Sequence, residues 1–103
     1  MSIVWHNFKD TSTSVAGMAI VTKGFKAYLH SHSEREIYHF LSGKGYLYID
    51  GNISVVQAPY SIEIDSNKIH AMTPISDFVI LKYEFPNNGP FNSIKYHYLT
   101  SHI

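Results

Sequence analysis

The sequence has no cysteine, and Arg35 is the single arginine among its 103 residues. Without cysteine the chain cannot form disulfides, thiolate metal sites or a cysteine nucleophile. Lysine plus arginine equal aspartate plus glutamate at eight each, so the formal net charge is zero. A neutral chain with one arginine lacks the basic surface that nucleic-acid backbones require. We therefore expect no nucleic-acid partner.

Long hydrophobic runs are missing as well, because no stretch of about 18 apolar residues occurs in the chain. The N-terminal region carries polar His6, Asn7 and Lys9, where a signal sequence needs apolar residues. These features predict a cytoplasmic protein with no membrane partner. The length predicts a single domain over residues 1–103, since two separate cores would each be too small to be stable.

Strand-forming residues dominate what is present. Short runs rich in tyrosine, isoleucine and valine recur between turn signals, and windows typical of helices are missing. The tripeptide Asp50-Gly51-Asn52 predicts a tight hairpin, because these residue types tolerate positive φ. Many short strands in one domain predict an all-β sandwich or barrel. The predicted strands are Met18–Val21, Phe25–His32, Glu36–Ser42, Gly45–Asp50, Asn52–Gln57, Tyr60–Ile64, Ile69–Thr73, Phe78–Phe85 and Ile94–Leu99.

Histidine is abundant, with seven in the chain. His30 and His32 are two residues apart, so in a strand their side chains leave the same face. Glu36 opens the next predicted strand, and an adjacent antiparallel pair would bring two imidazoles and a carboxylate to one point. His70 would add a fourth ligand from a facing strand. Such ligands suit Zn, Fe, Ni, Mn or Cu, and two histidines with one carboxylate are typical of non-heme iron sites.

The spacing around these residues also matches a known pattern. The segment reads Gly24, five residues, His30-Ser31-His32, three residues, Glu36, six residues and Gly43. At every fixed position it resembles the first sequence motif of the cupin superfamily. Of the second cupin motif only His70 survives, and Asn67 replaces a glycine that would have positive φ.

The resemblance implies a single-domain jelly-roll β-barrel with one divalent transition metal, Fe, Mn, Ni or Zn, inside it. The implied metal ligands are His30, His32, Glu36 and His70. The other histidines are predicted to be surface or internally satisfied residues: His6, His39, His97 and His102. Four residues in phase with the ligands are interpreted equally well as core or as pocket lining: Tyr28, Tyr38, Phe40 and Met72.

Four protein ligands would leave a six-coordinate ion with up to two open positions, which favours chemistry over a purely structural role. We predict catalytic roles for Glu36, which would tune the ion, and for Tyr38, which follows it on the same face and would orient a substrate. The resulting hypothesis is a metal-dependent enzyme, a dioxygenase or an isomerase/lyase, acting on a small oxygenated organic molecule. Cupin-like barrels also include non-catalytic sensors, so a metal-dependent ligand-binding or regulatory module is the alternative, and a metal-stabilised interaction domain is a third.

A second copy of the chain is the expected protein partner. Open edge strands need cover, and the segment Met1–Phe8 is apolar enough to pair with a neighbouring chain. Resemblance to small cupins also implies a homodimer.

Overall fold

The computed structural model describes residues 3–10, 15–25, 27–85 and 95–96, and within them it contains ten strands and no helix. No helix long and apolar enough to cross a membrane is therefore present in these ranges. All eight strand pairings are antiparallel. The sequence prediction of an all-β fold is confirmed.

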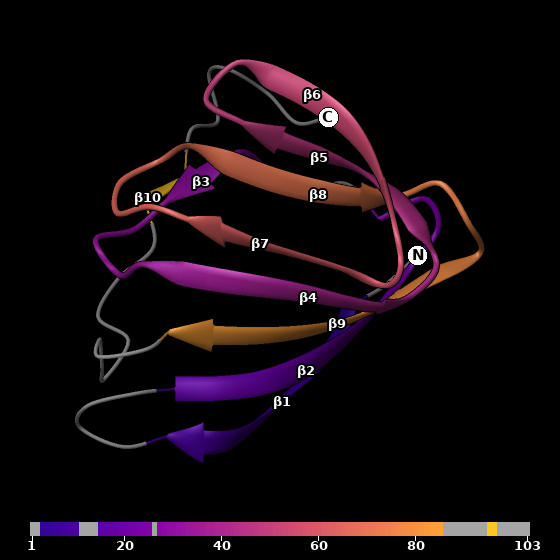
Figure 1. Cartoon of the computed structure of the whole chain (residues 1–103), viewed down its shortest axis with the longest axis horizontal. Helices are drawn as coiled ribbons and strands as arrows, with labels where there is room; N and C mark the ends of the chain where they lie inside the picture. The colour runs from indigo at the N-terminus through magenta and orange to yellow at the C-terminus, as the bar shows by residue number, and fades with distance from the viewer. Residues whose placement is uncertain (1–2, 11–14, 26, 86–94, 97–103) are drawn as a thin grey trace.

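The strands form two five-stranded sheets, which lie in separate halves of the molecule in Figure 1. The first sheet has, in spatial order, β1 (Ile3–Asp10), β2 (Val15–Thr22), β9 (Phe78–Phe85), β4 (Glu36–Ser42) and β7 (Tyr60–Ile64). The second has β10 (Lys95–Tyr96), β3 (His30–Ser31), β8 (His70–Pro74), β5 (Lys44–Ile49) and β6 (Asn52–Gln57). Chain neighbours such as β3 and β4 lie in different sheets, as in a jelly roll.

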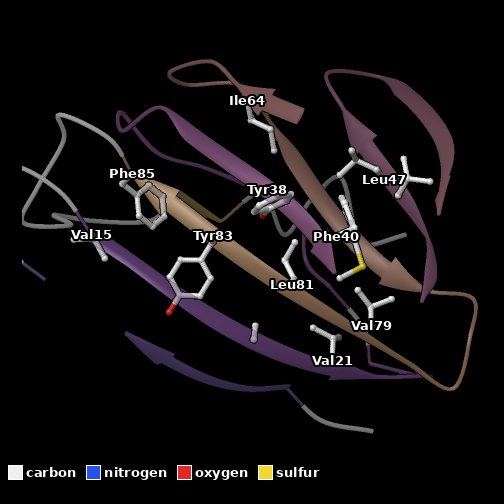
Figure 2. Packing of buried hydrophobic residues seen from close by; sticks show 13 residues of the cluster. Val15, Val21, Tyr38, Phe40, Leu47, Ile64, Val79, Leu81, Tyr83 and Phe85 are labelled. Carbon is white, nitrogen blue, oxygen red and sulfur yellow. The ribbon is translucent and has the colours of Figure 1, made fainter. Parts of the chain in front are cut away.

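The core lies between the two sheets because alternate residues of each strand point to the same face. Along β9 the buried residues alternate with partly exposed ones, and Phe40 of β4 is 1% exposed. From the second sheet, Leu47 and Met72 join the same cluster. Figure 2 shows Phe40 and Leu47 pointing into the space between the sheets. Phe40 and Met72, which the sequence left open, thus belong to the core.

Several sequence predictions are confirmed at residue level. Four predicted strands have the observed bounds: Glu36–Ser42, Asn52–Gln57, Tyr60–Ile64 and Phe78–Phe85. The hairpin between β5 and β6 turns at Asp50 and Gly51, whose φ angles are 44° and 90°. Asn67 has a φ of 65°, as expected of a residue replacing a glycine.

Two strand predictions are wrong. Phe25–His32 is not one long strand, because β3 pairs with β8 only at His30 and with β10 only at two positions. The segment before β3 instead packs Ala27 and Leu29 against Ala71, in a small cluster separate from the main core. The second difference concerns β1. From the sequence, the segment Met1–Phe8 was expected to pair with a neighbouring chain, whereas β1 pairs with β2 of the same chain along its length. Of the last predicted strand, Ile94–Leu99, only Lys95–Tyr96 is described.

Candidate metal centre

The predicted ligands come from both sheets. His30 lies in β3 and is the register partner of His70 in β8, so these two side chains are neighbours in one sheet. His32 follows β3 directly, and the short link 33–35 then carries the chain across to Glu36, the first residue of β4 in the other sheet.

The sequence expectation that the strands of His32 and Glu36 pair side by side is therefore wrong. β3 pairs with β8 and β10, whereas β4 pairs with β7 and β9. His70 faces Glu36 from the other sheet, as a facing strand implies, but it lies beside His30 in its own sheet. The side chains still converge, because the link 33–35 places Glu36 3.2 Å from His32 and from His70.

The ligand atoms are close enough to share one ion. One nitrogen from each of His30, His32 and His70 lies within 4.8 Å of the other two. Oε1 of Glu36 lies 3.2 Å from Nε2 of His32 and 3.2 Å from Nε2 of His70. His32, Glu36 and His70 are 6%, 5% and 1% exposed, so three of the four groups are shielded from water.

Each imidazole is held by its other nitrogen. Nδ1 of His30 donates to the main-chain carbonyl of Tyr28 at 3.0 Å, Nδ1 of His32 to that of Glu34 at 2.8 Å, and Nδ1 of His70 to that of Lys68 at 2.8 Å. A carbonyl can only accept, so Nδ1 carries hydrogen in all three rings. In a neutral ring this puts the lone pair on Nε2, which is the form that binds metals.

The contacts with Glu36 show that the residues fit a metal. Nε2 of His32 and Nε2 of His70 each lie 3.2 Å from the same carboxylate oxygen, and since Nδ1 already carries hydrogen, these contacts are favourable when Nε2 holds a proton or a metal ion. A divalent ion placed among the three atoms supplies this positive charge. Imidazole and carboxylate together suit a first-row divalent ion such as Fe, Mn, Ni or Zn.

The pKa shifts show the same attraction for positive charge. Burial would raise the pKa of Glu36, but hydrogen bonds from His32 and His70 lower it below 4.5. Burial would lower the pKa of His32, but its hydrogen bond to Glu36 and the charge of that carboxylate raise it above 6.5. Burial and the neighbouring His70 lower the pKa of His30 to about 4. Near neutral pH, Glu36 is therefore ionised and His30 is a neutral imidazole.

Aromatic side chains close the centre on the core side. The ring of Phe85 stands edge-on to His32 with centroids 5.5 Å apart, and the ring of Tyr38 lies 6.0 Å from that of His70. Both side chains point between the sheets in Figure 2. Among the four predicted ligands only His30 is partly exposed, so the centre meets solvent on the His30 side.

Tyr38 is buried, and its hydroxyl interacts with the carboxylate of Glu36. It forms a side-chain hydrogen bond with Glu36, in which the phenol donates to the carboxylate. Burial and the charge of Glu36 raise the pKa of Tyr38 well above 10, so the hydroxyl keeps its proton.

Other residues considered from the sequence lie away from the centre. His6 is exposed on β1. His39 points outward as predicted, with Nδ1 2.7 Å from Oγ of Ser61 and Nε2 3.4 Å from a carboxylate oxygen of Glu84. Tyr28, interpreted from the sequence as either core or pocket lining, is 45% exposed and is therefore not a core residue. His97 and His102 lie outside the described residues.

Sequence reasoning missed Glu34. The tripeptide Ser33-Glu34-Arg35 reads as a solvated polar loop, yet Glu34 is 3% exposed. Extending the alternation of β4 backwards from Glu36 by two residues would have placed Glu34 on the inner face, and this was the available signal.

Comparison with family models and with curated proteins finds no match. Among solved structures the chain is similar to an RmlC-like cupin from Shewanella frigidimarina, with a TM-score of 0.76 and 20% identity over 82% of this chain and 76% of that chain. The chain has the cupin fold.

Two enzymes with a cupin-like fold are similar at lower identity. The polyketide cyclase RemF from Streptomyces resistomycificus has a TM-score of 0.80 and 14% identity, over 93% of this chain and 71% of that chain. The DMSP lyase DddQ from Ruegeria pomeroyi has a TM-score of 0.79 and 13% identity, over 89% of this chain and 50% of that chain. The chain therefore spans about half the length of that lyase.

The site predicts one metal ion per chain. We expect His32→Ala to abolish binding at micromolar metal, because it removes a buried ligand that bridges to Glu36. His39→Ala, which changes a histidine outside the centre, should bind one equivalent like the wild type. Isothermal titration with Mn²⁺ or Zn²⁺, with metal content checked by elemental analysis, measures both. Equal binding by the two variants would refute the ligand assignment.

The same geometry predicts that the ion supports the fold. Its ligands come from two sheets, so binding ties them together and favours the folded state. Removing metal with a chelator should lower the melting temperature by several degrees, and adding metal should restore it. The scan should be repeated on His32→Ala, whose melting temperature should not respond to either treatment. An unchanged melting curve after verified metal removal would contradict this prediction.

Proposed function

We propose that this protein binds one divalent transition metal through His30, His32, Glu36 and His70 and acts as a metal-dependent enzyme on a small oxygenated organic molecule. The observation that carries the proposal is the convergence of three fixed imidazoles on one carboxylate, partly open on the His30 side. Structural zinc sites are normally closed by four ligands, whereas catalytic sites keep a position for substrate.

Of the two reaction classes expected from the sequence, the lyase or isomerase class has the stronger support. Two similar structures are named as a lyase and a cyclase. A bound divalent ion would supply Lewis-acid stabilisation of negative charge that develops on a substrate oxygen. The alternative, a dioxygenase, would require Fe(II) and dioxygen at the same ligands.

The chain's own residues set the conditions for this chemistry. Glu36 holds negative charge at the centre, and Tyr38 fixes the orientation of that carboxylate through its hydrogen bond. Tyr38 is thus a positioning residue rather than a group that meets substrate. The rings of Tyr38 and Phe85 exclude water from the core side. Substrate must therefore approach past His30, which favours a small molecule that ligates through oxygen.

A second candidate function is a metal-dependent binding or regulatory module. It is favoured by the packing behind the ligands, where side chains of the main core fill the space between the sheets. A ligand could then contact the ion at the rim without being enclosed, and enclosure is what excludes water from most catalytic sites.

A compound screen separates these functions. Protein reconstituted anaerobically with Fe(II) or Mn(II) should bind small carbonyl, enol or sugar-like compounds, seen as a change in the metal's spectrum, and should convert some of them. Glu36→Ala should lose turnover. Tyr38→Phe should lower kcat about ten- to a thousandfold, a range typical of losing one positioned hydrogen bond.

The matched control is Tyr46→Phe, which changes a tyrosine on β5 that is 44% exposed, and it should leave turnover unchanged. Oxygen consumption during turnover would identify the dioxygenase alternative. Saturable binding without any product would support the binding module. If no compound perturbs the bound metal, both functions are refuted.

We also propose that the protein is a homodimer through the β1 side of the first sheet. Among the described residues β1 has a partner strand, β2, on one side only. Val4 of β1 and its register partner Ile20 of β2 are 65% and 47% exposed, so the outer face is apolar at this edge. Exposed apolar surface next to an open edge favours association.

Light scattering tests this proposal. The wild type should have about twice the chain mass of 11.7 kDa, and the double variant Val4→Lys/Ile20→Lys should be monomeric. Ile53→Lys is the control, because Ile53 is 60% exposed on β6 of the other sheet and should leave the dimer intact. A wild-type mass near 11.7 kDa across a wide concentration range would exclude the dimer.

A further inference from the structure

A second buried carboxylate lies beside the metal centre. Five polar or charged side chains are buried in the described part of the chain, and all belong to the centre or adjoin it: Ser31, His32, Glu34, Glu36 and His70. Glu36 is a predicted ligand, whereas Glu34 is not. It lies in the link 33–35 that carries the chain from one sheet to the other.

Glu34 contacts the imidazole of His32 on its Nδ1 side. Its main-chain carbonyl accepts the hydrogen bond from Nδ1 of His32 at 2.8 Å. Its side-chain Oε1 lies 3.9 Å from the same nitrogen, with the two side chains 4% and 2% exposed. Glu34 therefore contacts the His32 imidazole through two groups, its main-chain carbonyl and its side-chain carboxylate.

The two contacts act differently on the ring. The carbonyl fixes the ring orientation and the hydrogen on Nδ1, and any residue at position 34 could supply it. The carboxylate adds negative charge next to Nδ1–H, where low polarity strengthens its effect, and this makes Nε2 a stronger electron donor. Burying a carboxylate costs free energy unless positive charge lies nearby. The side chain of an ordinary surface loop would therefore remain in water.

We propose that Glu34 is a positioning residue for the metal, acting through His32 to raise metal affinity. The inference rests on the metal site proposed above. It predicts that the charge of Glu34 strengthens metal binding beyond any effect that the residue has on the metal-free fold.

The test is Glu34→Gln, which keeps the size of the side chain and the main-chain carbonyl and removes the charge. Isothermal titration with Mn²⁺ and with Zn²⁺ should give a Kd about ten- to a hundredfold weaker than that of the wild type, the range found for partners of metal-binding histidines. Adding metal should raise the melting temperature of the variant by less than it raises that of the wild type. A merely structural role would instead lower the melting temperatures of the metal-free and metal-bound forms equally.

Two further variants complete the design. Glu63→Gln removes an acidic group that is 46% exposed on β7, and its Kd should match the wild type. Glu34→Asp keeps the charge and should bind metal more tightly than Glu34→Gln, which also provides a measurement if the glutamine variant does not fold.

The outcomes separate the two proposals. If the wild type binds no metal, the metal site itself is refuted. If the wild type binds metal and Glu34→Gln binds it equally well, the role of Glu34 is refuted while the site stands. If Glu34→Asp binds as weakly as Glu34→Gln, the carboxylate charge is not the cause, and the proposal is overturned as well.

Discussion

Three hydrogen bonds from imidazole Nδ1–H groups to main-chain carbonyls determine the character of the site. They decide which nitrogen of each ring carries hydrogen, and they leave the Nε2 lone pairs directed at one place. Glu36 puts a carboxylate oxygen at that place from the opposite sheet. Because the acceptors of these hydrogen bonds are backbone atoms, the main-chain path fixes the direction in which each Nε2 points. The suitability of the site for a cation is thus a property of the main-chain path.

That path is in turn held by two turns with positive φ. Asn67, with a φ of 65°, donates its main-chain N–H to the carbonyl of His32 at 2.8 Å. Asp50, with a φ of 44°, donates its N–H to the carbonyl of Ile69 at 2.8 Å and accepts the N–H of Ile69 on Oδ1 at 2.8 Å. Asparagine and aspartate adopt this conformation more readily than most residues. The hairpin between β5 and β6 therefore does more than reverse the chain, because it anchors the residue that precedes His70.

The sequence was informative about features that depend on residues close together in the chain. Period-two alternation and the motif spacing identified all four proposed ligands, and the hairpin at Asp50 followed from its residue types. The sheet to which each ligand belongs could not be read in this way, because β3 ends after two residues and the chain then crosses to the other sheet. The length of β3 depends on its pairing with β8 and β10, which are distant in the sequence. Glu34 was missed for a related reason, since it lies in the link just before β4, outside the strand whose alternation was used.

The main core of the fold is distinct from the proposed metal centre, although the two share a wall. The main core joins both sheets through side chains that involve no metal, such as Phe40 and Leu47, so most of the apolar stabilisation is independent of the centre. Tyr38 and Phe85 belong to this core and also form the inner wall of the centre. A small molecule cannot enter the space that they occupy without disrupting packing that stabilises the fold. The proposed function therefore requires that a ligand reach the ion at the rim beside His30, where its selection would depend on the few groups there and on the charge of the centre.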